Sequence, residues 1–174
     1  MKKVLFNLII VLFALSCSTD ESNNIQNSFS FNGSGYTTSF AYHNPGGRAF
    51  VFSSIDRTLD SYTEVRGRFD LRHPDGNLEP MTYTTNNNGI QGVVEFNKNI
   101  IKENGEFISS GETLAFTCCS ESNSNGFQSG TATVNSIEYN NDGRVTFIDI
   151  TYNFKWDGKE INGNFSGEVY DNPY

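Results

Sequence analysis

Between residues 130 and 170 the chain carries two hairpin signals, set among runs of alternating apolar and polar residues. The first signal is Asn140-Asn141-Asp142-Gly143 and the second is Asp157-Gly158. Asp-Gly between alternating runs is the strongest short-range sign of a β-hairpin, because a two-residue type I′ turn requires positive φ at both positions. Two consecutive hairpins predict an antiparallel three-stranded meander over residues 130–139, 144–155 and 160–170.

Short strands separated by turn signals are also predicted upstream of this meander. The clearest covers residues 62–71, whose apolar members share one face and whose charged members, among them Glu64 and Asp70, share the other. This alternation is typical of a sheet that packs on one side and faces water on the other. Further strands are predicted over residues 28–31, 36–42, 49–53, 81–84, 93–96, 106–109 and 114–119.

The composition agrees with a sheet protein. The chain contains 15 Phe, 8 Tyr and 16 Gly, so strand formers and turn formers are both abundant. No segment combines helical periodicity with caps, except for a possible turn around residues 56–61. The predicted fold is therefore all-β: a single antiparallel β-sandwich or barrel of about ten strands. The sequence alone does not separate a sandwich from a barrel.

The first 26 residues differ from the rest of the chain. Lys2 and Lys3 precede an apolar run over residues 4–15, and a polar stretch follows Cys17. A basic start, an apolar run and a small residue before the cleavage point are typical of a secretory signal peptide. The run is shorter than the ~20 apolar residues that a membrane-spanning helix needs. We expect a signal peptide over residues 1–16, a flexible tether over 17–26 and the β domain over 27–174.

The segment Ala14-Leu15-Ser16-Cys17 resembles the lipobox of bacterial lipoproteins, although Ala14 stands where that motif favours leucine. The resemblance implies that the Cys17 thiol carries a diacylglycerol and that cleavage makes Cys17 the new N-terminus. Its acyl chains would hold the domain on a bilayer, since each buried CH₂ contributes ~0.8 kcal/mol. The alternative is an ordinary secretory signal with a chance cysteine at the cut.

Several short features resemble small uncharacterised lipoproteins of the Bacteroidota. These are the Lys-Lys start, the Ser-Cys cut, the tether rich in Asn, Ser and acidic residues, and the closing segment Ile161–Gly167. The pair Asp20-Glu21 resembles the signal that directs such lipoproteins to the outer leaflet; the alternative is a tether that happens to be acidic. The resemblance implies an extracellular β domain on the outer membrane, on its periplasmic or cell-surface face. Cys17 is the one functional residue it carries over.

The charge of the chain limits its partners. Formal net charge is −8, and no cluster of Lys or Arg is present. Nucleic acid is therefore excluded as a partner, because its phosphates need basic side chains to displace counterions. Direct docking on anionic lipid headgroups is disfavoured for the same reason, so the lipid on Cys17 is the expected attachment.

Cys118 and Cys119 are adjacent in the sequence. An oxidising compartment favours a vicinal disulfide between them. Strain opposes it, because neighbouring Cα atoms lie about 3.8 Å apart, below the usual disulfide range. Such a bridge would present a rigid apolar plate. The alternative is two free cysteines on a strand, one facing inward and one outward.

Trp156 is the only tryptophan and stands at the Asp157-Gly158 turn, with Tyr139 and Tyr152 in the same two hairpins. An aromatic side chain exposed at a loop tip is a candidate for ligand binding. The three residues are therefore the predicted ligand-binding group. The alternative for Trp156 is that it folds back as a lid on the end of the barrel.

Catalytic motifs are not found in the sequence, and we expect no cofactor and no metal site. His43 and His73 lie beside turns, where histidine is usually solvated. The favoured function is a non-catalytic surface lipoprotein that binds a glycan or another extracellular ligand through loops at one end of the fold. The alternative is a structural accessory subunit of an outer-membrane assembly that recognises protein. An unidentified hydrolase comes third.

Overall fold

The computed structural model describes residues 27–44, 48–73, 76–85, 89–117 and 126–173. The predicted signal peptide and tether lie outside these residues. The described part contains no α-helix, which confirms the all-β prediction, and so no helix there is long and apolar enough to cross a membrane. The strands are β1 (Ser28–Phe31), β2 (Ser34–Thr37), β3 (Phe40–His43), β4 (Ala49–Ser53), β5 (Tyr62–Leu71), β6 (Thr82–Thr84), β7 (Ile90–Glu103), β8 (Glu106–Ser109), β9 (Glu112–Thr117), β10 (Phe127–Tyr139), β11 (Val145–Trp156) and β12 (Lys159–Asp171).

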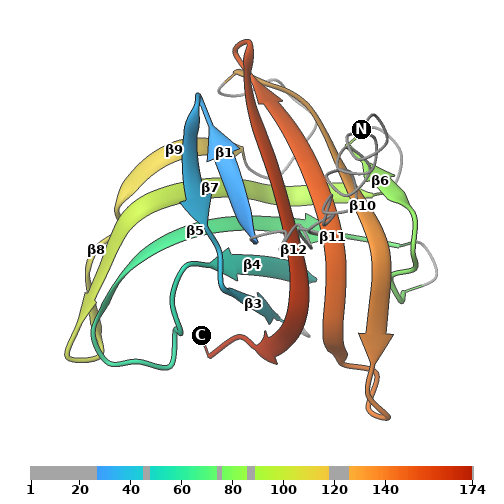
Figure 1. Ribbon diagram of the computed structural model, residues 1–174, viewed down its shortest axis with the longest axis horizontal. Coiled ribbons are helices and arrows are strands. Elements are labelled where there is room, and N and C mark those ends of the chain that lie inside the picture. The colour runs from blue at the N-terminus through green and yellow to red at the C-terminus, as the bar shows by residue number, and fades with distance from the viewer. Residues whose placement is uncertain (1–26, 45–47, 74–75, 86–88, 118–125, 174) are drawn as a thin grey trace, which may run out of the picture.

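These strands form one sheet that curls into a half-barrel (Figure 1). The path across the sheet is β6-β10-β11-β12-β3-β4-β5-β7-β8. The β1–β2 hairpin attaches to β12 beside this path, and β9 attaches to β7. In Figure 1, β10, β11 and β12 run steeply across the front of β4, β5 and β7.

The predicted purely antiparallel sheet is wrong at β12. Residues 161–164 of this strand pair with β1, whereas residues 169–171 pair in parallel with β3. Because β2 is antiparallel to β1, the chain leaves that hairpin running in the direction of β12, so β3 joins β12 as a parallel neighbour. Residues 36–42, expected as one strand, divide between β2 and β3. The sheet is therefore mixed, with twelve described strands rather than about ten.

The C-terminal meander is confirmed. Strands β10, β11 and β12 pair consecutively and antiparallel. Asp157 and Gly158 have φ of 43° and 75°, the positive values that a type I′ turn requires. In the other turn, the Asn140 side-chain oxygen accepts hydrogen bonds from the backbone N–H groups of Asp142 and Arg144, which holds the loop closed.

A β-bulge near the start of β11 explains an irregularity in its apolar pattern. Val145 and Ile148 are both buried, although they are three residues apart and would otherwise lie on opposite faces. The register between β10 and β11 shifts where Tyr139 pairs with Val145 and Glu138 with Phe147. The extra residue in β11 returns Ile148 to the core face.

Aromatic rings join the two halves of the curled sheet. Three strands of one half, β4, β5 and β7, place Phe52, Phe69 and Phe96 against the inward aromatic residues of β11. These contacts agree with the crossing of β11 over the three strands in Figure 1. The ring-centroid distances are 5.7 Å for Phe52–Tyr152, 5.1 Å for Phe69–Phe154 and 6.4 Å for Phe96–Trp156.

The predicted solvent face of β5 is wrong at two residues. Glu64 and Asp70 were expected on that face, but their exposed fractions are 0% and 9%. The segment after β4 folds back over this face and brings the Arg57 Nε atom to 3.2 Å from a Glu64 carboxylate oxygen. The Ser53 hydroxyl donates a hydrogen bond to the same carboxylate at 2.8 Å. A buried carboxylate is tolerated here because it is paired and hydrogen-bonded.

Candidate functional site

The predicted cysteine sites lie outside the described residues. Cys17 belongs to the N-terminal segment, and Cys118 and Cys119 directly follow the last residue of β9. Lipidation of Cys17 and a bridge between Cys118 and Cys119 therefore remain predictions.

Trp156 is the last residue of β11, and only 5% of it is exposed. Its ring packs edge-on against Phe127 with centroids 4.8 Å apart, and against Phe154 at 6.0 Å. Of the two alternatives for Trp156, the structure therefore shows a ring that folds back over the end of the half-barrel. It does not show an aromatic side chain exposed at a loop tip. Trp156 points to the core face of β11, whereas the Asp157-Gly158 turn that follows it is exposed to water.

The other two predicted binding residues do not lie beside Trp156. Tyr139 pairs with Val145 at the far end of the β10–β11 ladder, whereas Trp156 pairs with Phe127 at the near end. The Tyr139 hydroxyl donates a hydrogen bond to the Leu78 carbonyl oxygen at 2.9 Å, and it closes the loop before β6. Tyr152 is buried in the core, and burial raises the pKa of its phenol far above the ordinary value.

A pocket of about 380 Å³ lies at the end of the half-barrel where Trp156 is found. This volume is within the ~300–1,000 Å³ typical of small-molecule sites. Three parts of the chain enclose it: the last residue of β1, a run of β9, and the turn between β11 and β12. The lining residues are Phe31, Thr113, Leu114, Ala115, Phe116, Trp156, Asp157 and Lys159.

The pocket lies along the edge of β9. Residues 113–116 line it without a gap. Successive strand residues point to opposite faces, so a cavity over one face would touch only alternate residues. In the described part of the chain, β9 pairs with β7 and with no other strand. Backbone N–H and C=O groups on its second edge are therefore available to a ligand.

The apolar surface of the pocket comes from aromatic rings. Trp156 forms a buried wall, while Phe116 is 38% exposed at the edge strand. Phe31 is the last residue of β1, and the Lys159 ammonium lies over its ring, 5.8 Å from the centroid. A ring-shaped ligand would thus meet aromatic surface on more than one side.

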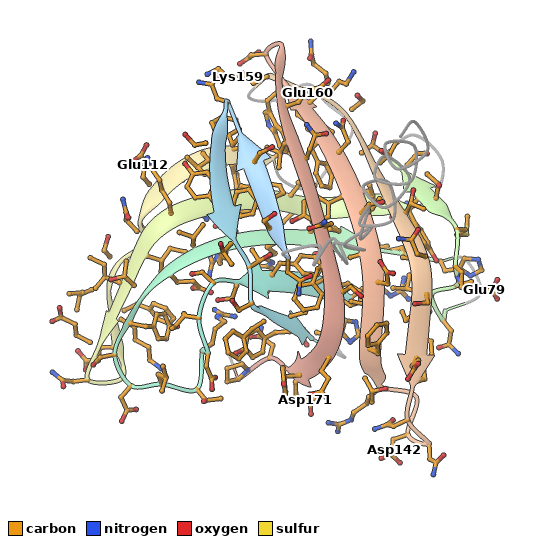
Figure 2. The ribbon with its side chains drawn as sticks, viewed as in Figure 1. Glu79, Glu112, Asp142, Lys159, Glu160 and Asp171 are labelled. Carbon is orange, nitrogen blue, oxygen red and sulfur yellow. The ribbon has the colours of Figure 1, made fainter. Side chains whose placement is uncertain are left out.

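The two charged groups that line the pocket, Asp157 and Lys159, belong to the β11–β12 hairpin. Lys159 lies at the tip of this hairpin beside Glu160, and Glu112 projects from β9; neither glutamate lines the pocket (Figure 2). The Asp157 carboxylate lies against Gly126, so closely that a Cβ at residue 126 would be 2.2 Å from it. Asp157 is therefore held on the side where β10 begins, and Lys159 on the side of β1.

Sequence reasoning missed this grouping. Phe31 and Phe116 were visible as strand residues, and Asp157 as a turn residue, but no local signal connects them. Their meeting depends on β9 lying across from the β11–β12 turn, which are segments about 40 residues apart in the chain. The sequence contains only a weak sign that Lys159 belongs to a binding site: it is a cation directly after a hairpin turn in an acidic chain.

The pocket offers binding groups. It combines aromatic surface, a carboxylate, an ammonium, a threonine hydroxyl and an edge of β9 that pairs with no described strand. Among the residues that the structure describes, no three His, Cys, Asp or Glu side chains are grouped to hold a metal ion. Comparison of the chain with protein-family models, with curated proteins and with solved structures finds no match.

Proposed function

We propose that this protein is a non-catalytic lipoprotein of the outer membrane that binds an extracellular glycan in the pocket beside β9. The observation that carries the proposal is the concave, aromatic-lined pocket with a carboxylate and an ammonium on its rim. Lipid on Cys17 would anchor the domain, and the tether over residues 17–26 would let the pocket face away from the membrane.

Sugars suit this combination of groups. A pyranose ring has apolar faces that pack on aromatic rings, and a rim of hydroxyls that both donate and accept hydrogen bonds. Phe116 offers an accessible ring, the Asp157 carboxylate accepts from hydroxyls, and Lys159 donates to them. The free edge of β9 adds backbone donors and acceptors. Few but well-placed polar groups in an apolar pocket are what orient a small ligand.

A thermal-shift screen of the purified chain in detergent against a panel of neutral and acidic oligosaccharides tests the proposal. A glycan present at 100 times its Kd should add ~2.7 kcal/mol to the free energy of unfolding. Phe116→Ala should abolish the shift. Phe107→Ala is the matched control, because Phe107 is also an exposed phenylalanine of an edge strand, β8, and does not line the pocket.

Two results would contradict the glycan proposal: no shift with any member of the panel, or a shift that Phe116→Ala leaves intact. Trp156→Ala is a poor probe, because this ring is part of the core and its loss would cost ~3–5 kcal/mol of stability with or without a ligand.

A second candidate function is a structural accessory subunit of an outer-membrane protein assembly. It is favoured by exposed apolar side chains on the edge strand β8, where Phe107 and Ile108 are 49% and 56% exposed. A strand edge that exposes large apolar side chains is typical of a surface that contacts another protein. Mild detergent extraction should then yield the chain in a complex that Phe107→Ser with Ile108→Ser dissociates. A chain that is extracted as a monomer contradicts this candidate.

A further inference from the structure

Lys159 differs from the other lysines that the structure describes. The Lys98 ammonium lies 3.1 Å from the Glu112 carboxylate, and Lys155 lies 3.3 Å from Glu160. Lys102 donates a hydrogen bond to the Leu59 carbonyl oxygen at 3.0 Å. Lys159 forms no ion pair with any described carboxylate, although it lines the pocket. Its ammonium lies over the face of the Phe31 ring.

The position of Lys159 is nevertheless defined. It is the first residue of β12 and pairs with Trp156 across the hairpin. The cation–π contact with Phe31 holds the ammonium over one wall of the pocket. Asp157 stands only two residues away, but its carboxylate is directed to Gly126 and leaves the ammonium unneutralised.

This ammonium is unusual in its surroundings. The chain has 20 acidic and 12 basic residues, so its net charge repels anions. A positive charge at this pocket can attract an anionic group to that point. A hydrogen bond between an ammonium and a carboxylate is about twice as strong as one between neutral groups.

We infer that the pocket selects sugars that carry a carboxylate, that is, uronic acids, and that Lys159 is the residue that determines this specificity. The inference rests on the proposed function. The ligand carboxylate binds the Lys159 ammonium, and the sugar ring packs on Phe116. Hydroxyls on the far side of the ring donate to Asp157, which the fold keeps away from Lys159.

The single tryptophan makes the test direct. Trp156 lines the pocket and is the only tryptophan of the chain, so its fluorescence reports on this site alone. The full chain in detergent is titrated with trimers of galacturonic, glucuronic and mannuronic acid and with the methyl ester of each. Acid and ester share the ring and its hydroxyls and differ in charge.

At least one free acid should bind about tenfold or more tightly than its ester, the ratio expected for one charge-assisted hydrogen bond. Lys159→Gln should remove that difference, and Lys159→Arg should keep it. Lys155→Gln is the matched control on the same hairpin, since Lys155 pairs with Glu160 and does not line the pocket.

The outcomes separate the two proposals. If a sugar binds, but acid and ester bind equally or Lys159→Gln changes nothing, the uronic-acid inference is overturned and the glycan proposal stands. If no acid, no ester and no neutral sugar binds, both are overturned.

Discussion

Tyr152 carries its hydroxyl into the middle of the aromatic core. The ring lies 5.7 Å from Phe52 and 5.0 Å from Phe69, and a Cβ at residue 163 would be 2.3 Å from it, so Gly163 is required there. The hydroxyl has no hydrogen-bond partner among the described residues. Burying an unpaired polar group costs ~1–3 kcal/mol, so the core at this residue is stabilised by the ring and destabilised by its oxygen.

Tyr152→Phe should therefore raise the free energy of unfolding by about 1 kcal/mol. Tyr83→Phe is the matched control, because the Tyr83 hydroxyl donates to the Glu79 carbonyl oxygen and accepts from the Glu79 N–H. That variant should lose about 1–2 kcal/mol. Urea unfolding measures both. A Tyr152→Phe protein that is less stable than the wild type would show that the hydroxyl has a partner.

His43 makes stability depend on pH. Burial lowers the pKa of His43 below its ordinary value of 6.5, and the Asp171 carboxylate opposes this shift. Below pH ~6.5 the unfolded chain takes up a proton that the folded chain resists, so acidification favours unfolding. The stabilising contribution is complete above that pH and is lost as the pH falls toward the folded pKa.

His43→Gln should thus lose less stability than the wild type between about pH 7.5 and about pH 5.5 in urea unfolding. His73→Gln provides the control for replacing a histidine elsewhere. Equal losses in wild type and His43→Gln would refute the role of His43.

At the scale of the elements, the segment between β4 and β5 is fastened to the sheet by buried charges. Arg57 is 4% exposed and pairs with the fully buried Glu64. A second Arg57 nitrogen donates to the Asn172 side-chain oxygen at 2.7 Å, which ties the segment to the end of β12 as well. The guanidinium also lies over the Tyr42 ring, 5.9 Å from its centroid.

Arg57→Met should cost ~3–5 kcal/mol of unfolding free energy, because it leaves the buried Glu64 carboxylate with only the more distant Arg66 guanidinium, 3.9 Å away. Adding Glu64→Leu should recover much of that loss. Lys98→Met, which breaks an exposed pair with Glu112, should cost less than ~1 kcal/mol. A double variant as unstable as Arg57→Met alone would mean that the segment is held by packing and not by this pair.

For the whole molecule, the two halves of the curled sheet depend on one contact layer. The Phe residues of β4, β5 and β7 meet the inward residues of β11, so these strands lose their burial together. The free-edge strands β2 and β8 lie outside this layer; their burial patterns contain no fully buried residue.

Amide hydrogen exchange should therefore be slowest in β4, β5, β7 and β11, at rates set by global unfolding, and fast in β2 and β8. Peptide-resolved exchange by mass spectrometry measures this. Protection of β8 equal to that of β5 would contradict the expectation and would point to a partner covering the β8 edge.

Much of the fold followed from local signals. The strands Ala49–Ser53, Tyr62–Leu71 and Glu106–Ser109 lie where alternation and turn residues predicted them. The meander and its Asp157-Gly158 turn were likewise predictable, because side-chain period and turn geometry depend on neighbours in the sequence. The bulge at the start of β11 is also visible in the sequence, because the apolar residues change from odd to even positions between Phe147 and Ile148.

The remaining features depend on contacts between distant segments. Alternation shows which side of a strand is apolar, but it does not show which strand lies beside it, so the parallel pairing of β12 with β3 left no signal. Trp156 stands next to a turn, where the sequence is equally compatible with an exposed or a buried side chain. It is buried because its ring packs against Phe127. The pocket is the clearest case. The sequence determined an all-β chain, its strands and its hairpins, whereas only the tertiary structure brought Phe31, Phe116 and Lys159 together, because a cavity is formed by segments that share no local pattern.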